Sequence, residues 1–86
     1  MIGSIHFSIV RKVQIMATRV ESEIVGTVWK VEKSVGDQVE EYDVLIIIES
    51  MKMENPVEAP CDGRVVEICV AEGESVEEGT LIAVIE

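Results

Sequence analysis

The sequence predicts an all-β domain, a flattened β-barrel or sandwich made of two small antiparallel sheets with pseudo-twofold symmetry. Its 86 residues allow one small domain. The core must be built from Val and Ile, because 48% of the chain is hydrophobic but only 3% is aromatic, and β-branched residues favour strands. The chain also repeats itself at a step of 37 residues, and each half alternates apolar runs with glycine-containing turns. No amphipathic helix is expected.

The repeat relates residues 17–49 to residues 54–86, which align without a gap. Identical pairs include Gly26 with Gly63 and Gly36 with Gly73. One half is too short to bury a sheet face by itself, so the two halves must pack together.

Strands are expected at equivalent places in both halves. In the first half they lie around Val20, over Gly26–Val31 and over Val44–Glu49. In the second half they lie around Val57, over Gly63–Val70 and over Leu81–Glu86. Residues 65–70 alternate with the period of two that is typical of a half-buried strand. Turns are expected at Gly36, Gly73 and Gly79, where glycine adopts a positive φ without steric cost.

The charge distribution argues against several classes of partner. The formal charge is −10, and residues 16–86 hold 5 basic and 17 acidic side chains, a balance of −12. Phosphate contacts dominate nucleic-acid affinity, so we expect no nucleic-acid partner. No apolar stretch reaches the 18 or more residues of a membrane span, so we expect no membrane partner either. We expect a monomer.

Residues 1–15 are expected to be a disordered extension that precedes a domain over 16–86. The segment is apolar but is interrupted by His6, Arg11 and Lys12. Its basic residues follow its apolar run, the reverse of a signal peptide. Met16 is therefore an alternative start of the chain.

The two cysteines predict no disulfide scaffold and no metal site. Cys61 and Cys69 are eight residues apart, a spacing that fits neither a CxxC pair nor a zinc motif. We interpret them as reduced thiols of a cytoplasmic protein.

The seam between the two halves holds a lysine at the tip of a tight hairpin. Glu49 closes one strand and Glu54 opens the next, so the residues between them must reverse the chain. Two-residue hairpin turns prefer Asn-Gly or Asp-Gly, yet here Met51 and Lys52 take that place. A locally costly turn indicates a functional demand on its side chains. The alternative is an ordinary solvated lysine.

The residues Ser50-Met51-Lys52-Met53 resemble the Ala-Met-Lys-Met motif of biotinyl domains, the modules of biotin-dependent carboxylases. The resemblance covers residues 20–86, including Gly26–Val31, Gly36–Val39 and the stretch from Asn55 to Val66. It implies the barrel-sandwich hybrid fold of the biotinyl/lipoyl class. The interval between Gly36 and Lys52 is too short for the protruding thumb of some biotin carriers, so the domain should be thumbless.

The chain departs from the family pattern at a few positions. Ser50 replaces the usual alanine. Tyr42 stands where glycine is usual and where the second half has Gly79, so the turn before Val44 should be altered. The proline that often precedes Gly26 is absent, although its equivalent Pro60 is present.

The resemblance implies a carrier, not an enzyme. A biotin–protein ligase would present biotinyl-adenylate, and Lys52 would attack its carbonyl to bind biotin covalently. Because an exposed lysine is almost fully protonated near neutral pH, the ligase must supply the deprotonation. The biotin carrier would then shuttle carboxybiotin between biotin carboxylase and carboxyltransferase components.

The resemblance also assigns the residues beside the lysine. Met51 and Met53 would serve partner recognition, since pliable thioethers suit more than one enzyme. Glu49, Ser50 and Glu54 would complete the hairpin. The alternative is that both methionines pack over the sheet edge. Trp29 is expected to lie in the core or to cover a cleft.

Two other functions remain open. A lipoyl carrier, or a carrier of both biotin and lipoate, has the same fold and hairpin lysine, although the methionines on both sides favour biotin. An unmodified structural or interaction module of the same fold is the other. An enzyme acting alone is the weakest option, because no nucleophile–base pair, metal constellation or phosphate-binding loop is present in the sequence.

Overall fold

The computed structural model describes residues 17–86, and this part of the chain folds into eight β-strands. In chain order they are β1 (Thr18–Glu21), β2 (Gly26–Val31), β3 (Gln38–Val39), β4 (Val44–Ser50), β5 (Met53–Glu58), β6 (Gly63–Ile68), β7 (Ser75–Val76) and β8 (Leu81–Ile85). The expectation for residues 1–15, and Met16 as an alternative start, fall outside the described residues. Among residues 17–86 there is no helix with the length and apolar character to cross a membrane.

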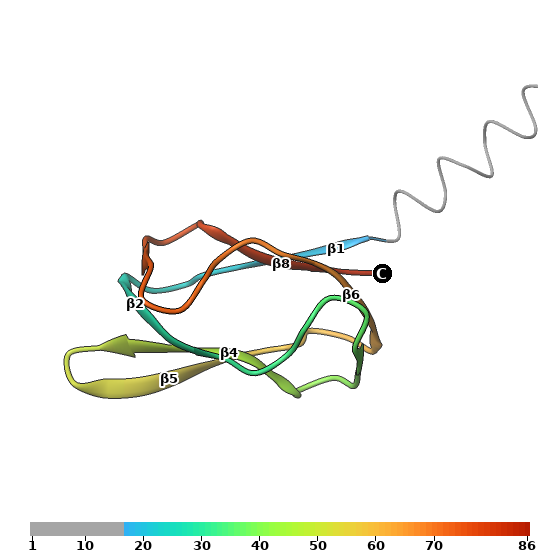
Figure 1. Ribbon diagram of the computed structural model, residues 1–86, viewed down its shortest axis with the longest axis horizontal. Coiled ribbons are helices and arrows are strands. Elements are labelled where there is room, and N and C mark those ends of the chain that lie inside the picture. The colour runs from blue at the N-terminus through green and yellow to red at the C-terminus, as the bar shows by residue number, and fades with distance from the viewer. Residues whose placement is uncertain (1–16) are drawn as a thin grey trace, which may run out of the picture.

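The strands form two antiparallel four-stranded sheets that lie face to face as two layers (Figure 1). One sheet has the order β1-β8-β6-β3 and the other the order β5-β4-β2-β7. The predicted all-β class and flattened two-sheet architecture are therefore confirmed. The connection from β3 to β4 is the turn over residues 40–43, so the domain is thumbless as expected.

The internal repeat appears as pseudo-twofold symmetry. Moving β2 and β3 along the sequence by 37 residues gives the bounds of β6 and β7. Each sheet takes two strands from each half, so the halves interlock and neither can form its sheet alone. The sequence did not predict β3 and β7, because two-residue strands carry no period of their own. It also placed the end of the β6 strand at Val70, and the strand ends at Ile68.

A β-bulge interrupts the alternation that the sequence predicts in β6. Val65 pairs with Ile85 and Glu67 pairs with Val84, which leaves Val66 as the extra residue. Val65 is buried and Val66 is exposed, and Ile68 packs against the core again. A strict period of two over residues 65–70 is therefore wrong, because the bulge turns two successive side chains to the same side.

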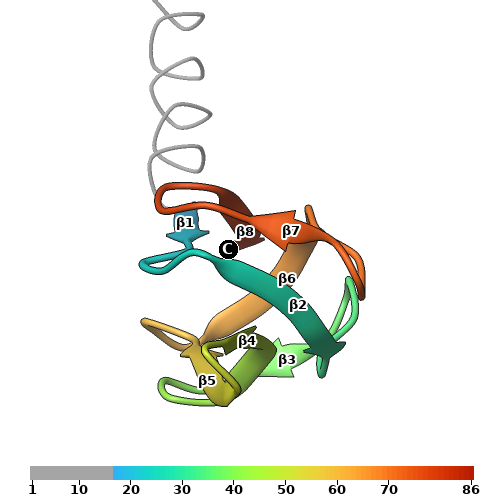
Figure 2. The same ribbon diagram turned by 90° about the vertical axis from the view of Figure 1, so that its left-hand side faces the viewer.

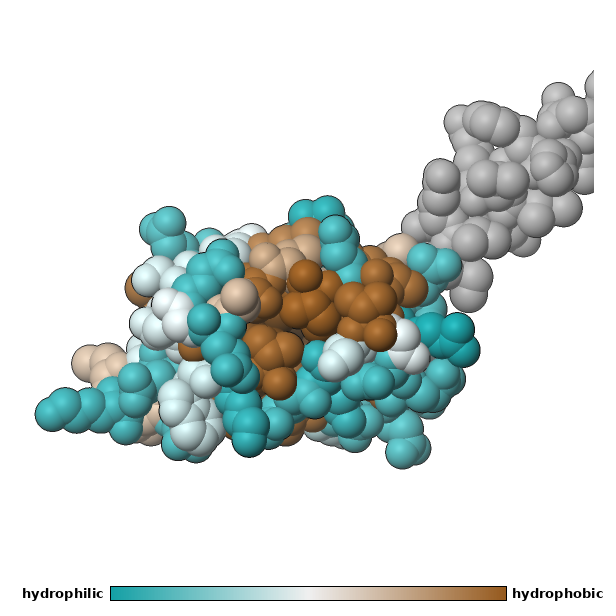
Figure 3. All heavy atoms as spheres, in the orientation of Figure 1, coloured by the Kyte–Doolittle hydropathy of each residue, from teal (hydrophilic) through white to brown (hydrophobic). Residues whose placement is uncertain are grey.

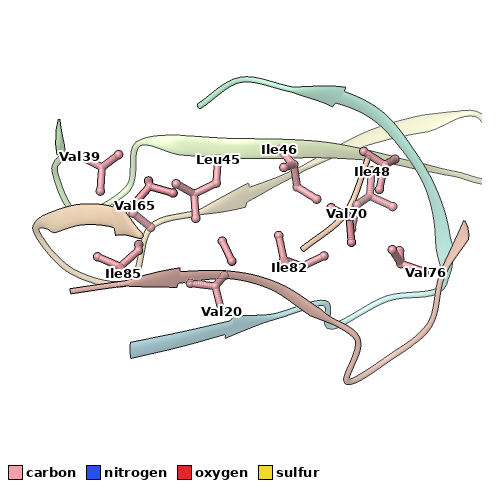
Figure 4. Packing of buried hydrophobic residues seen from close by; sticks show 13 residues of the cluster. Val20, Val39, Leu45, Ile46, Ile48, Val65, Val70, Val76, Ile82 and Ile85 are labelled. Atoms are coloured by element: carbon pink, nitrogen blue, oxygen red, sulfur yellow. The ribbon is translucent and has the colours of Figure 1, made fainter. Parts of the chain in front are cut away.

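Thirteen buried hydrophobic residues form one core between the sheets (Figure 4). Leu45, Ile46 and Ile48 project from β4, and Ile82 and Ile85 project toward them from β8. All five are at most 1% exposed. The prediction that aliphatic side chains build the core is confirmed.

The turn before β4 keeps its geometry despite Tyr42. Tyr42 has a φ of 77°, and its equivalent Gly79 has a φ of 90°. The Tyr42 amide donates to the carbonyl of Ala59 at 2.8 Å, just as the Gly79 amide donates to the carbonyl of Ser22 at 2.8 Å. The expectation of an altered turn is wrong, because these backbone hydrogen bonds hold the tyrosine in a conformation that favours glycine.

Close packing of β2 on β4 fixes the base of the β4–β5 hairpin. A Cβ atom at Gly26 would lie 2.5 Å from the Glu49 carbonyl oxygen and 2.6 Å from Cγ2 of Ile48. No side chain fits in that space. A glycine is therefore needed for the backbone of β2 to approach β4, the strand that leads to the lysine. Gly63 has the same role in the other half, with Cγ2 of Ile85 at 2.6 Å from the added atom.

Candidate functional site: an exposed lysine hairpin

Strands β4 and β5 form a hairpin with a two-residue turn at its tip. Glu49 pairs with Glu54 and Ser50 pairs with Met53, which leaves Met51 and Lys52 as the turn. Their φ angles are 53° and 63°. Positive φ at both central residues is the feature of a type I′ turn, for which Asn-Gly is preferred. The tight hairpin predicted at the seam of the repeat is present, and it holds Lys52 in a conformation that a lysine rarely adopts.

The tip of the hairpin is open to solvent. Met51 is 92% exposed and Met53 is 65% exposed, and Lys52 is also exposed. The hairpin extends from the end of the molecule opposite the C-terminus, and it lies in the lower layer when viewed end-on (Figures 1 and 2). In the space-filling view this end is a narrow, largely hydrophilic projection (Figure 3). Within residues 17–86, no packed side chains cover the tip, and the exposure of both methionines shows that they do not pack over the sheet edge.

Two acidic residues lie on the strands just below the turn. Glu49 and Glu54 are exposed and lie opposite each other on adjacent strands, while Ser50 is half-buried. Like charges in such a pair repel one another, which destabilises the hairpin slightly. The structure therefore brings together all six hairpin residues that the sequence singled out: Glu49, Ser50, Met51, Lys52, Met53 and Glu54.

Asn55 braces the hairpin, a contribution that the sequence reasoning missed. Its Nδ2 atom donates to the carbonyl of Met53 at 3.2 Å and to the carbonyl of Ile48 at 3.4 Å. The second bond crosses from β5 to β4 just below the turn. An asparagine inside a strand was the signal, because asparagine is depleted in strands unless its side chain has a specific partner.

Three residues that the sequence singled out lie outside the hairpin. Trp29 is 50% exposed, so the expectation that it lies in the core is wrong. Cys61 and Cys69 are free thiols, as predicted. Partial desolvation and the nearby carboxylate of Glu67 raise the pKa of Cys69. This thiol is exposed, but the raised pKa reduces its thiolate fraction near neutral pH.

Two shallow hollows lie away from the lysine. One, of about 340 Å³, is lined by Gln38, Gly63, Arg64, Val66 and Glu86. The other, of about 230 Å³, lies between β1 and the C-terminal end of β5, and Arg19 and Pro60 are among the residues that line it. Neither is lined by a residue of the hairpin tip. The lysine is thus presented on a projection, where a partner protein can enclose it.

Comparison with known proteins places this arrangement in a family. The family model described as "Biotin-requiring enzyme" matches residues 13–85. The chain is 49% identical to the biotinylated protein TB7.3 homolog of Mycobacterium leprae over 81% of its own length and 99% of the relative's. It is 41% identical to the biotin/lipoyl attachment protein of Bacillus subtilis over 73% of its own length and 86% of the relative's.

Among solved structures, the chain is similar to the urea carboxylase of Kluyveromyces lactis, with a TM-score of 0.78 and 46% sequence identity. The match covers 81% of this chain and 6% of that much longer one. The chain therefore spans only a small part of that enzyme's length. The family match spans most of the chain, and the fold agrees with it: the chain belongs to the biotin-requiring enzyme family and is a biotin carrier domain.

Proposed function

We propose that Lys52 is the residue that carries biotin. The observation that supports this most strongly is the type I′ turn, which holds an exposed lysine at the outermost point of the domain. The motif Ser50-Met51-Lys52-Met53 and the family membership point to the same residue. A biotinyl group fits there, because the tip is open to solvent and long enough to enter another protein. We place the carrier domain over residues 16–86.

The attachment step requires only the amine from this chain. The neutral Nζ of Lys52 attacks the carbonyl carbon of biotinyl-adenylate, which a biotin–protein ligase supplies. An amide bond forms, the bond between that carbon and the adenylate oxygen breaks, and AMP leaves with the bonding electrons. The ligase accepts the proton that the amine loses.

The fold contributes by holding the lysine, and any group attached to it, where other enzymes can reach it. Bound biotin supplies a site that accepts a carboxyl group from one enzyme and releases it to another. Because the domain tethers that site, its effective concentration at both enzymes is high without a new contact. The likeness to one segment of a urea carboxylase supports a biotin carboxylase and a carboxyltransferase as the two partners. Met51 and Met53 are positioned to contact them, since both are exposed beside the lysine. We also propose that the protein acts in the cytoplasm.

A lipoyl group is the second candidate, and one observation favours it. The Bacillus subtilis relative, 41% identical to this chain, is named for both biotin and lipoyl attachment. The same amine of Lys52 would accept either acyl group through the same amide chemistry. The two differ in mass and in avidin binding, so a single experiment separates them.

The test is to express the chain with and without a biotin–protein ligase and to map the modification. We expect an avidin-reactive protein with the added mass of one biotinyl group on the peptide that contains Lys52. Lys52→Arg should remove the signal while it keeps the positive charge. Lys30→Arg is the matched control: Lys30 is also exposed, and its Nζ lies 4.0 Å from the Glu32 carboxylate. That variant should be labelled normally.

The possible outcomes assign the function. A biotin adduct on Lys52 supports the proposal, and a lipoyl adduct there supports the second candidate. Unmodified Lys52 in cells that modify a known carrier would refute both and leave an interaction module. Label on Lys30 or Lys33 would show that the site is wrong.

A further inference from the structure

Trp29 is the most unusual side chain outside the hairpin, and a β-bulge determines its direction. Val28 pairs with Ile48 and Lys30 pairs with Ile47, which leaves Trp29 as the extra residue of β2. Val28 and Ile48 are buried, so their side chains face the core. Trp29 and Lys30, both exposed, face the opposite side together with Ile47. The bulge therefore places the indole on the outer surface of the β5-β4-β2-β7 sheet.

The indole belongs to an apolar row that crosses three strands. Ile47 pairs with Pro56 of β5 and with Lys30 of β2, and the bulge places Trp29 beside Lys30, so Trp29 adjoins Ile47 and Pro56 on the outer face. Trp29 and Pro56 are exposed and Ile47 is half-buried. We call these three residues the outer strip. One polar row, made of Thr27, Glu49 and Glu54, separates it from the hairpin tip.

The outer strip is within reach of a group attached to Lys52. Ser50 lies three residue steps beyond Ile47 along β4, a distance of about 10 Å, and the turn adds a few ångströms. The lysine side chain and the acyl chain of biotin together contain eleven bonds between the Cα atom and the ring, which gives an extended reach of about 14 Å. An arm that folds back over the polar row therefore ends at the strip.

We propose that the biotinyl group on Lys52 rests on the outer strip when no partner enzyme is bound. This inference relies on Lys52 being the attachment site. The fused rings of biotin have an apolar face, and the indole, the isoleucine and the proline present a matching surface. Contact removes both surfaces from water, while the polar urea group of biotin stays at the surface. The carrier then presents its ring by releasing it from its own sheet.

The pseudo-twofold symmetry shows that the strip is special to the hairpin sheet. The equivalent row on the other sheet is Val66, Val84 and Arg19. There a valine replaces the tryptophan and an arginine replaces the proline, so the large flat apolar surface is missing. That row lies on the opposite outer face, in the layer that does not hold the hairpin (Figure 1). The tryptophan occurs only on the face that the tethered group can reach.

The single tryptophan of the chain makes the test direct. Tryptophan fluorescence and its quenching by acrylamide are measured on the full chain before and after enzymatic biotinylation, with complete attachment to Lys52 verified by mass. We expect the emission to move to shorter wavelength and the quenching constant to fall by roughly half, because one face of the indole is covered. The double variant Trp29→Val/Val66→Trp moves the only indole to the symmetric position and should show neither change.

A second measurement follows the biotin end of the contact. Avidin should capture biotinylated Trp29→Ala faster than the biotinylated parent, because the ring is no longer held. Since Trp29 is half exposed, the variant should keep its fold, which circular dichroism verifies. If Lys52 is biotinylated and the fluorescence of Trp29 is unchanged, the resting contact is refuted while the carrier function stands. Equal changes in both indole positions would also refute it, and a lack of attachment at Lys52 would remove both proposals.

Discussion

Tyr42 adopts a backbone conformation for which the equivalent position has glycine. Its φ of 77° lies in the left-handed region, which is a genuine outlier for a bulky residue. Its side chain is 68% exposed, so little buried surface compensates for the strain. Backbone hydrogen bonds of the turn hold it there, including the bond from the Asp43 amide to the Glu40 carbonyl at 3.0 Å. The local sequence and the turn therefore disagree at this residue.

We predict that Tyr42→Gly stabilises the domain. Relief of a left-handed conformation contributes about 1–2 kcal/mol, and the greater freedom of glycine in the unfolded chain cancels about 0.5–1 kcal/mol of it. The net gain in the free energy of unfolding should be about 0.5–1 kcal/mol, measured by urea denaturation. Gly79→Tyr is the matched variant and should destabilise. Loss of stability in Tyr42→Gly would mean that the tyrosine side chain makes a contact that outweighs the strain.

At the scale of an element, the turn of the β4–β5 hairpin exposes Lys52 at a cost in stability. Its turn has the geometry of Asn-Gly but the side chains of Met51 and Lys52. Two non-glycine residues with positive φ cost free energy that the paired strands below must offset. The strand pairing of β4 with β5 offsets this cost, and it runs from the Val44 and Glu58 pair to the Ser50 and Met53 pair. The side chain of Asn55 adds hydrogen bonds to it. This strain supports the proposal that function selects the side chain at Lys52.

We predict that Met51→Asn/Lys52→Gly increases stability and abolishes attachment. The preferred type I′ residues should raise the free energy of unfolding by about 1 kcal/mol or more. Urea denaturation and avidin blotting measure the two effects on one protein. Asn55→Ala serves as the comparison, since it weakens the hairpin by about 1 kcal/mol but leaves the lysine in place. If the double variant were less stable, the turn would not be the source of strain.

At the scale of the whole molecule, two interlocked halves make a rigid base for one projection. Both sheets take strands from both halves, so the fold forms only when residues far apart in sequence meet. The tight approaches at Gly26 and Gly63 are equivalent contacts of the two halves. Only the first-half contact lies at the base of the lysine hairpin.

We predict that Gly26→Ala and Gly63→Ala destabilise the domain to a similar extent. An added methyl group would meet backbone oxygen at 2.5 Å in the first case and at 2.8 Å in the second. Overpacking of this kind costs about 1–3 kcal/mol. Thermal and urea unfolding of both variants measure the loss. A large effect at one glycine and none at the other would contradict the equivalence of the two halves.

Much of the fold could be predicted from the sequence because the repeat and the apolar pattern are local. Aliphatic runs gave six strands, and the glycines at 36, 73 and 79 gave the turns, each with a φ near 90°. The hairpin lysine could be singled out because its turn contradicts local preference and because Ser50-Met51-Lys52-Met53 resembles the biotinyl motif. The two-residue strands β3 and β7 were missed, since they exist only through pairing with β6 and β2.

The sequence by itself determined the all-β class, the internal symmetry and the lysine at the seam, because each is written in residue types at fixed spacing. Tertiary structure alone decided where the intervening side chains face. Trp29 lies outside because β2 bulges against Ile47, and Tyr42 keeps a left-handed backbone because the amide and carbonyl groups of neighbouring turns hold it. Strand register fixes the direction of Trp29, and long-range hydrogen bonds fix the backbone of Tyr42. Neither effect produces a periodic pattern in the sequence.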